Sequence, residues 1–166
     1  DLAFDPNAVK NSGTFGAIRN KLKQNAAAYM IKLDDVSLDQ YAQDLYLGKA
    51  TYEGLNASFT KQAKDFNPAI ASLIDQGYTP SAYFSSYANV ASNLLGRPVD
   101  FMGGDTKMFG ALTNTMTGDA GLERPMTRGE FERYVRQTPE WDTSTNARDE
   151  AYSTVSTMLD SFGINN

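Results

Sequence analysis

Apolar side chains recur at steps of three and four along most of the chain, which is the spacing that lines one side of an α-helix. The first such stripe predicts a helix over residues 14–33, with the members Phe15, Ile18, Leu22, Ala26, Tyr29 and Leu33. No window shows the strict alternation of a β-strand, and no turn dipeptide joins two apolar runs. The pattern therefore predicts an all-α fold.

Later stripes predict a set of central helices within residues 37–95. Ser37 followed by Gln40 has the spacing of a capping box, and Thr51 can cap the next helix. The last helix of the set should begin at Thr79, because the proline that follows suits the first helical position. Glycines that disfavour helical geometry end three of these helices, at Gly48, Gly77 and Gly96. Asn67 with Pro68 should end or kink another, which continues or restarts up to Gln76.

Glycine and proline accumulate over residues 96–125, which predicts a loop-rich joint. Within it we expect one short helix after Asp105 and an exposed loop over residues 115–125. Together with the helices on either side, this joint predicts a single domain over residues 1–166. Its architecture should be a compact bundle of about six to seven short capped helices.

A C-terminal pair of helices is predicted over residues 127–163. Thr127 with Glu130 forms a second capping box, and Asn146 is the expected cap of the final helix. That final helix should bury one apolar stripe, made of Ala147, Ala151, Val155, Leu159 and Phe162.

The 166-residue chain contains neither cysteine nor histidine. This composition excludes disulfides, thiol nucleophiles, zinc sites of the usual kind and acid–base catalysis by imidazole. With 41% apolar residues and a net charge of -5, the chain should fold, and its surface as a whole does not favour nucleic acid. No apolar run approaches the roughly 20 residues that cross a bilayer. We therefore predict no catalytic residue, no metal, no cofactor and no membrane span.

Paired carboxylates are the one enzymatic arrangement that this composition leaves open, because glycoside cleavage needs two acids and no histidine. The candidates are Glu53, Glu130 and Glu140, with Asp100, Asp105 or Asp142. Glu53 and Glu130 are better explained as first-turn residues, where a negative charge suits the helix dipole. Glu140 lies in an expected helix-ending turn. A structural role is therefore favoured for each.

Two aspartate pairs, Asp34 with Asp35 and Asp100 with Asp105, could in principle bind a divalent cation, but their spacing fits no calcium loop. The run from Gly103 to Lys107 is only superficially like a phosphate loop, because its glycine–lysine spacing differs and no strand precedes it. We expect neither kind of site.

Positive charge is concentrated near the start of the chain, at Lys10, Arg19, Lys21, Lys23 and Lys32. A solvated helix face is the simpler interpretation. The alternative is an electrostatic contact between this basic first helix and an acidic protein or nucleic acid.

Large aromatic side chains crowd two stretches, around Tyr83 and around Trp141. Most are expected in the core, with their polar tips reaching the surface. The alternative is a protein interface, because such residues often anchor contacts. The candidate interface residues are Tyr83, Phe84, Tyr87, Tyr134 and Trp141.

Three segments carry recognisable motifs. Thr79–Phe84 starts a helix with the pattern T-P-x-x-Y-F, Met126–Trp141 is a Met-Thr start before a short helix and a Trp-containing turn, and Asn146–Gly163 is a final helix closing in Phe-Gly. In this order, the segments resemble the C-terminal region of virion structural proteins of tailed bacteriophages that infect actinobacteria and cyanobacteria. The resemblance covers about residues 34–163. It concerns caps and core positions, so it is more specific to a fold than to an activity.

The resemblance implies a non-enzymatic virion protein, tail-associated or internal, of the tape-measure-like or ejection kind, acting in particle assembly and genome delivery. Its implied partners are other virion proteins and further copies of the chain, with the phage genome as an added contact of the basic first helix. Its implied location is the virion. The alternative is a cell-wall-degrading (peptidoglycan hydrolase) module or fragment with paired carboxylates, because such regions occur beside peptidoglycan-degrading domains. The start at Asp1, without an initiator methionine, favours a part of a longer polypeptide.

Overall fold

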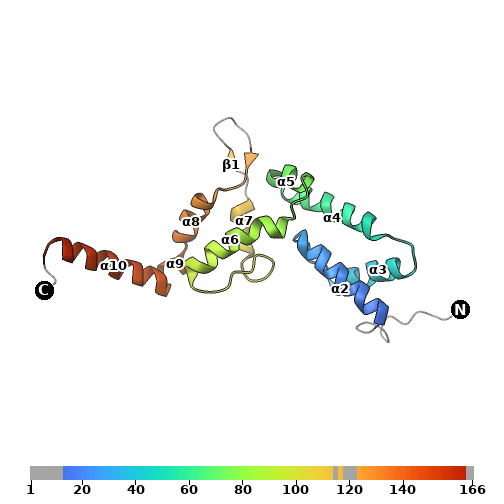
Figure 1. The fold of residues 1–166 in the computed structure, drawn as a ribbon, viewed down its shortest axis with the longest axis horizontal. Coiled ribbons are helices and arrows are strands. Elements are labelled where there is room, and N and C mark those ends of the chain that lie inside the picture. Colours follow the sequence, from blue (N-terminus) through green and yellow to red (C-terminus); the bar gives the residue numbers. More distant parts are fainter. Residues whose placement is uncertain (1–12, 114–115, 118–122, 164–166) are drawn as a thin grey trace. The chain divides into compact units, whose positions relative to one another are not determined.

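Most helices begin and end close to the caps and breakers seen in the sequence. The computed structural model describes residues 13–113, 116–117 and 123–163 (Figure 1). Its all-α fold class confirms the prediction. Contacts between residues divide the chain into two compact units, Asp1–Tyr83 and Phe84–Asn166, which we call unit 1 and unit 2. The division lies within helix α6, upstream of the glycine- and proline-rich stretch in which the sequence predicts a joint.

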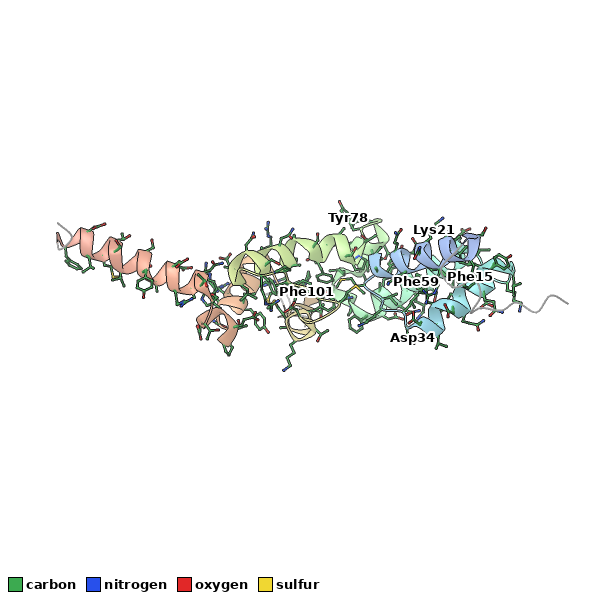
Figure 2. All side chains as sticks on the ribbon, turned by 90° about the horizontal axis from the view of Figure 1, so that it is seen from below. Phe15, Lys21, Asp34, Phe59, Tyr78 and Phe101 are labelled. Carbon is green, nitrogen blue, oxygen red and sulfur yellow. The ribbon has the colours of Figure 1, made fainter. Side chains whose placement is uncertain are left out.

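The described part of unit 1 is a set of packed helices that precede the start of α6. They are α2 (Gly13–Ala28), α3 (Asp35–Tyr46), α4 (Tyr52–Phe66), the short 3-10 helix η1 (Pro68–Ile70) and α5 (Ala71–Asp75). Phe15 and Leu22 of α2 form a buried cluster with Leu38 and Ala42 of α3; Phe15 is labelled in Figure 2. As predicted, α4 is capped by Thr51, whose hydroxyl accepts a hydrogen bond from the Gly54 amide at 3.1 Å.

Two boundaries in unit 1 differ from the prediction. Helix α3 is capped by Asp34, whose carboxylate accepts a hydrogen bond from the Ser37 amide at 2.7 Å, so the expected capping box at Ser37 is wrong. An aspartate is an equally good cap, and this one lies three residues closer to the preceding helix. Gln40 instead donates to Asp44 within the helix, at 3.1 Å.

Helix α2 ends five residues before the predicted Leu33. The amide of Met30 donates to the carbonyl of Ala27 and that of Ile31 donates to Ala26, both at 2.9 Å. These two bonds form a Schellman motif, which requires left-handed backbone at the residue after the cap. Met30 has a φ of 57° there, where glycine is usual. The absence of that glycine is why the sequence gives no sign of the boundary, and Leu33 packs against the unit 1 core from outside the helix.

The described part of unit 2 begins within α6 (Pro80–Leu95), which starts at the predicted proline. It continues with α7 (Thr106–Thr113), β1 (Met116–Thr117), β2 (Glu123–Arg124), α8 (Arg128–Arg136), α9 (Pro139–Asp142) and α10 (Thr145–Ser161). Strands β1 and β2 pair in antiparallel orientation inside the predicted exposed loop. Two-residue strands are too short to show alternation in a sequence.

Aromatic rings fill the core of unit 2. Phe131 of α8 is fully buried, and its ring makes edge contacts with those of Tyr87 and Phe101, at centroid distances of 5.5 and 6.2 Å. Phe84 makes a similar contact with Phe109 at 5.0 Å. The Tyr87 hydroxyl donates to the Met126 carbonyl at 2.8 Å, so its polar tip is satisfied at the edge of the core.

The N-terminus of α10 is held by two side chains with separate tasks. Ser144 caps it, accepting a hydrogen bond from the Ala147 amide at 3.0 Å, so the expected cap at Asn146 is wrong. The Asn146 side-chain amide instead donates to the carbonyls of Asn93 and Leu94, both at 2.8 Å. It thereby satisfies the end of α6, where helical carbonyls lack partners.

The predicted burial of the α10 stripe is also wrong, since none of the residues in this helix is buried. Ala147 and Leu159 are half-buried, whereas Ala151, Val155 and Phe162 are exposed. In Figure 1, α10 begins beside α9 and then runs away from α6 and α8. A periodic stripe shows which side of a helix is apolar, but it does not show that the same chain covers that side.

Candidate functional site

Two of the candidate catalytic acids meet around one cation. Arg97, just after α6, donates to Asp105 at 2.7 Å and to Glu140 at 2.5 Å. Glu140 lies in the first turn of α9 and not in a helix-ending turn as predicted. The three side chains border a groove of about 500 Å³ that Lys107 and Tyr134 also line. We call this arrangement the Arg97 clamp.

The electrostatics of the Arg97 clamp favour ion pairing over acid catalysis. Hydrogen bonding from Arg97 lowers the pKa of Asp105, even though burial acts in the opposite direction. The same two acids raise the pKa of Arg97. A general acid for glycoside cleavage needs a carboxyl whose pKa is raised so that it stays protonated. The clamp is therefore suited to linking α7 and α9 to the end of α6.

Glu130 belongs to the predicted capping box, which the structure confirms. Its carboxylate accepts from the Thr127 amide at 2.7 Å, and the Thr127 hydroxyl accepts from the Glu130 amide. Arg124 donates to both carboxylate oxygens, at 2.7 and 2.8 Å. These bonds, that from Arg124 foremost, hold the pKa of Glu130 well below its usual range. A carboxylate in this state anchors the start of α8.

Substituting Glu130→Gln should make the stability of the chain less dependent on pH at acidic pH. Because its pKa is lower in the folded chain, Glu130 contributes stability that is present above its unfolded pKa of about 4.3 and is lost as the pH falls through the folded value. Glutamine keeps the reach of the cap but does not titrate. Thermal unfolding between pH 7 and 2 should therefore show a smaller drop in Tm for E130Q than for the native chain. Glu132→Gln is the control, and an equal drop in both variants would contradict this role.

The remaining candidate acids support local turns. Glu53 and Asp142 lie in the first turns of α4 and α9. Asp100 accepts from the Met102 amide at 3.0 Å, while Asp105 accepts from the Asp100 amide at 2.8 Å. Across the residues that the structure describes, no group of acids is arranged to hold a metal ion.

The described basic residues of the first segment differ in their exposure and pairing. Lys10 lies outside the described residues, and Lys32 follows α2 in an exposed loop. Arg19 is bound to α3, at 2.6 Å from Asp39 and 2.7 Å from Asp35. The remaining two lysines, Lys21 and Lys23, are exposed on α2, and the ammonium group of Lys21 lies 4.2 Å from the centre of the Tyr52 ring. An electrostatic contact with a partner stays a prediction for the exposed lysines.

The candidate interface aromatics divide by burial. Phe84, Tyr87 and Trp141 are buried. Tyr83 and Tyr134 are half-buried, and Tyr134 stacks on Phe131 with a centroid distance of 6.2 Å. Burial within the chain matches the core interpretation for the first three, and the interface role stays a prediction for this set.

One exposed surface of the described chain follows an apolar stripe that the sequence predicts to be buried. A groove of about 400 Å³ runs along α10 from the ring of Trp141. We call it the α10 groove; its lining residues are Trp141, Ala147, Glu150, Ala151, Thr154, Val155 and Met158. At its rim Arg136 lies over the Trp141 ring, 4.7 Å from its centre, and donates to Glu150 at 2.6 Å.

Large apolar side chains are exposed over the middle and the C-terminal end of α10. Tyr152, Val155, Met158 and Phe162 are 74%, 53%, 56% and 76% exposed. At 100° per residue, Val155, Met158 and Phe162 fall on the same side of α10 as Ala147 and Ala151. Figure 2 shows the side chains of α10 standing clear of the other helices of unit 2. The apolar side of α10 is thus exposed along most of the helix.

Comparisons with known proteins give no relative for this chain: no family model matches it, and neither a curated protein nor a solved structure is significantly similar. In the part of the chain that the structure describes, no helix combines the length and the apolar character needed to cross a membrane.

Proposed function

We propose that this chain is a non-enzymatic assembly protein of a tailed-bacteriophage virion, tail-associated or internal, acting in particle assembly and genome delivery. The observation that carries the assembly role is α10, an entire helix whose apolar side is exposed. Contiguous apolar surface of this kind is typical of protein–protein contact sites. The phage context comes from the sequence resemblance of the helix starts and of the final helix.

The paired-carboxylate alternative has no comparable support. Asp105 and Glu140 are the candidate acids that the fold brings together, and both are bound to Arg97. Glu130 is engaged by Arg124 and by its own capping box. Hydrogen bonds lower the pKa of Glu130 and of Asp105, and Glu140 is ion-paired with Arg97, whereas the hydrolase reaction needs one protonated acid.

The assembly role is tested by locating the chain in purified particles. Antibody detection across a density gradient should find it in the fractions that hold intact virions. Substituting Ala151→Glu places a charge in the α10 groove and should reduce incorporation several-fold, because burying an unpaired charge at an interface is costly. Ser153→Glu, on the opposite side of the same helix, should leave incorporation unchanged. Detection of the chain only in the soluble fraction of infected cells would contradict the proposal.

A further inference from the structure

The composition of α10 indicates that this helix depends on a partner. Its middle, residues 153–157, reads Ser-Thr-Val-Ser-Thr, and these residue types have weak helix propensity. Isolated helices shorter than about 12–15 residues are marginal in water even with good helix formers, and most helices in proteins are stabilised by packing of the apolar side. Beyond its first turn, α10 receives little such packing from the described part of unit 2.

The apolar side of α10 changes character along its length. Near Trp141 it carries the small side chains of Ala147 and Ala151, which form the floor of the groove. At the other end it carries Met158 and Phe162, which are more than half exposed. The apolar side of α10 is therefore recessed near Trp141 and protrudes near Phe162.

These two ends are complementary to each other when two copies pair in opposite directions. A two-fold axis midway between Thr154 and Val155 sets Phe162 of one copy opposite Ala147 of the other, and Met158 opposite Ala151. The two longest side chains of this side, Met158 and Phe162, then each meet an alanine, which is how packed helices fill volume evenly. Parallel pairing would instead set alanine against alanine and phenylalanine against phenylalanine.

The residues that line the α10 groove are suited to binding an apolar side chain. The ring of Trp141 closes the recessed end, where Phe162 of a second copy would arrive. The one charged residue in the lining, Glu150, is already paired with Arg136 at the rim. Antiparallel helices also place opposite ends of their dipoles side by side, which is favourable.

We propose that α10 is a self-association site, at which two copies of this chain pair antiparallel with Phe162 of each copy seated in the α10 groove of the other. This inference rests on the proposed assembly function and names the partner of that surface. A 17-residue helix is about 25 Å long, so the contact is smaller than a standard interface of about 800 Å² per partner. The dimer is therefore reversible and depends on concentration.

Disulfide trapping tests the register directly, because the native chain has no cysteine. Full-length A151C mixed with full-length M158C should form a mixed disulfide under mild oxidation. Each variant alone should crosslink poorly, because the two copies of one position lie about 10 Å apart along the paired helices, beyond the roughly 7 Å limit for Cα atoms in a disulfide. Efficient crosslinking of each variant with itself, or no preference for the mixture, would overturn the antiparallel register.

Sedimentation velocity over a wide range of concentrations tests the association itself. The native chain should shift from monomer towards dimer, A151E should stay monomeric, and S153E should behave as the native chain. Circular dichroism of both variants confirms that they remain folded. A native chain that is monomeric at every concentration overturns the self-association site, and so does an A151E variant that still dimerises. If the native chain is monomeric but is still found in particles, the self-association site is wrong and the assembly role is kept. If the native chain dimerises but is never found in particles, only the assembly role is contradicted.

Discussion

Substituting Phe131→Ala should destabilise unit 2 by about 3–5 kcal/mol, which is a large fraction of the stability of a typical domain. Phe131 is fully buried, and its ring touches those of Tyr87 and Phe101. Truncation removes the transfer free energy of the ring and leaves a cavity. The surrounding rings belong to α6, the following loop and α8, so their collapse into that cavity requires several elements to shift together.

The single tryptophan makes this loss measurable. Trp141 is buried in unit 2, so its fluorescence should report the unfolding of that unit in urea. The midpoint should fall sharply for F131A. Phe162→Ala removes the same side chain from a site that is 76% exposed, and it should change the free energy of unfolding by no more than about 0.5 kcal/mol. Equal midpoints for F131A and the native chain would show that the ring cluster does not form the core of unit 2.

Substituting Arg97→Leu should lower the free energy of unfolding by about 1–3 kcal/mol, because two carboxylates lose the guanidinium to which both are hydrogen-bonded. The Asp105 side chain is only 10% exposed and would lose its cation. Its pKa should then rise from the lowered value towards the usual range. Since a lowered pKa contributes stability above the unfolded pKa, the penalty of R97L should be full at neutral pH and should shrink as the pH falls below about 4.

Urea unfolding of R97L at pH 7 and pH 3, followed by Trp141 fluorescence, measures both effects. Arg128→Leu is the control, because Arg128 is an exposed residue at the start of α8 and outside the clamp. A penalty for R97L that is the same at both pH values would show that the Arg97 clamp does not hold Asp105 ionised.

Local signals in the sequence were sufficient for much of the fold. The caps at Thr51 and Thr127 and the stop at Gly96 depend on side chains and backbone within a few residues, so spacing alone predicts them. The end of α2 at Met30 could not be predicted in this way, because a methionine occupies a conformation that normally calls for glycine.

Contacts between residues far apart in the chain could not be predicted from the sequence, for a different reason. Asn146 bonds to Asn93 and Leu94, more than fifty positions away along the chain. Arg97 likewise reaches Glu140 across 43 positions. Neither pairing has a local signature, so the residues of the Arg97 clamp were named as separate acids and the cation that joins them was missed.

The attachment of α10 through Asn146 makes this helix a lever. Its first turn is fixed to the end of α6 by two hydrogen bonds from one side chain, and the chain from Asn146 to Phe162 spans about 24 Å along the helix axis. Each degree of tilt at that pivot carries the tip near Phe162 through about 0.4 Å, by the geometry of a rigid rod of this length. A small adjustment at the end of α6 would thereby be magnified at the far end of α10, so that the two copies of the proposed dimer could be held at a range of angles without a change in the fold of either.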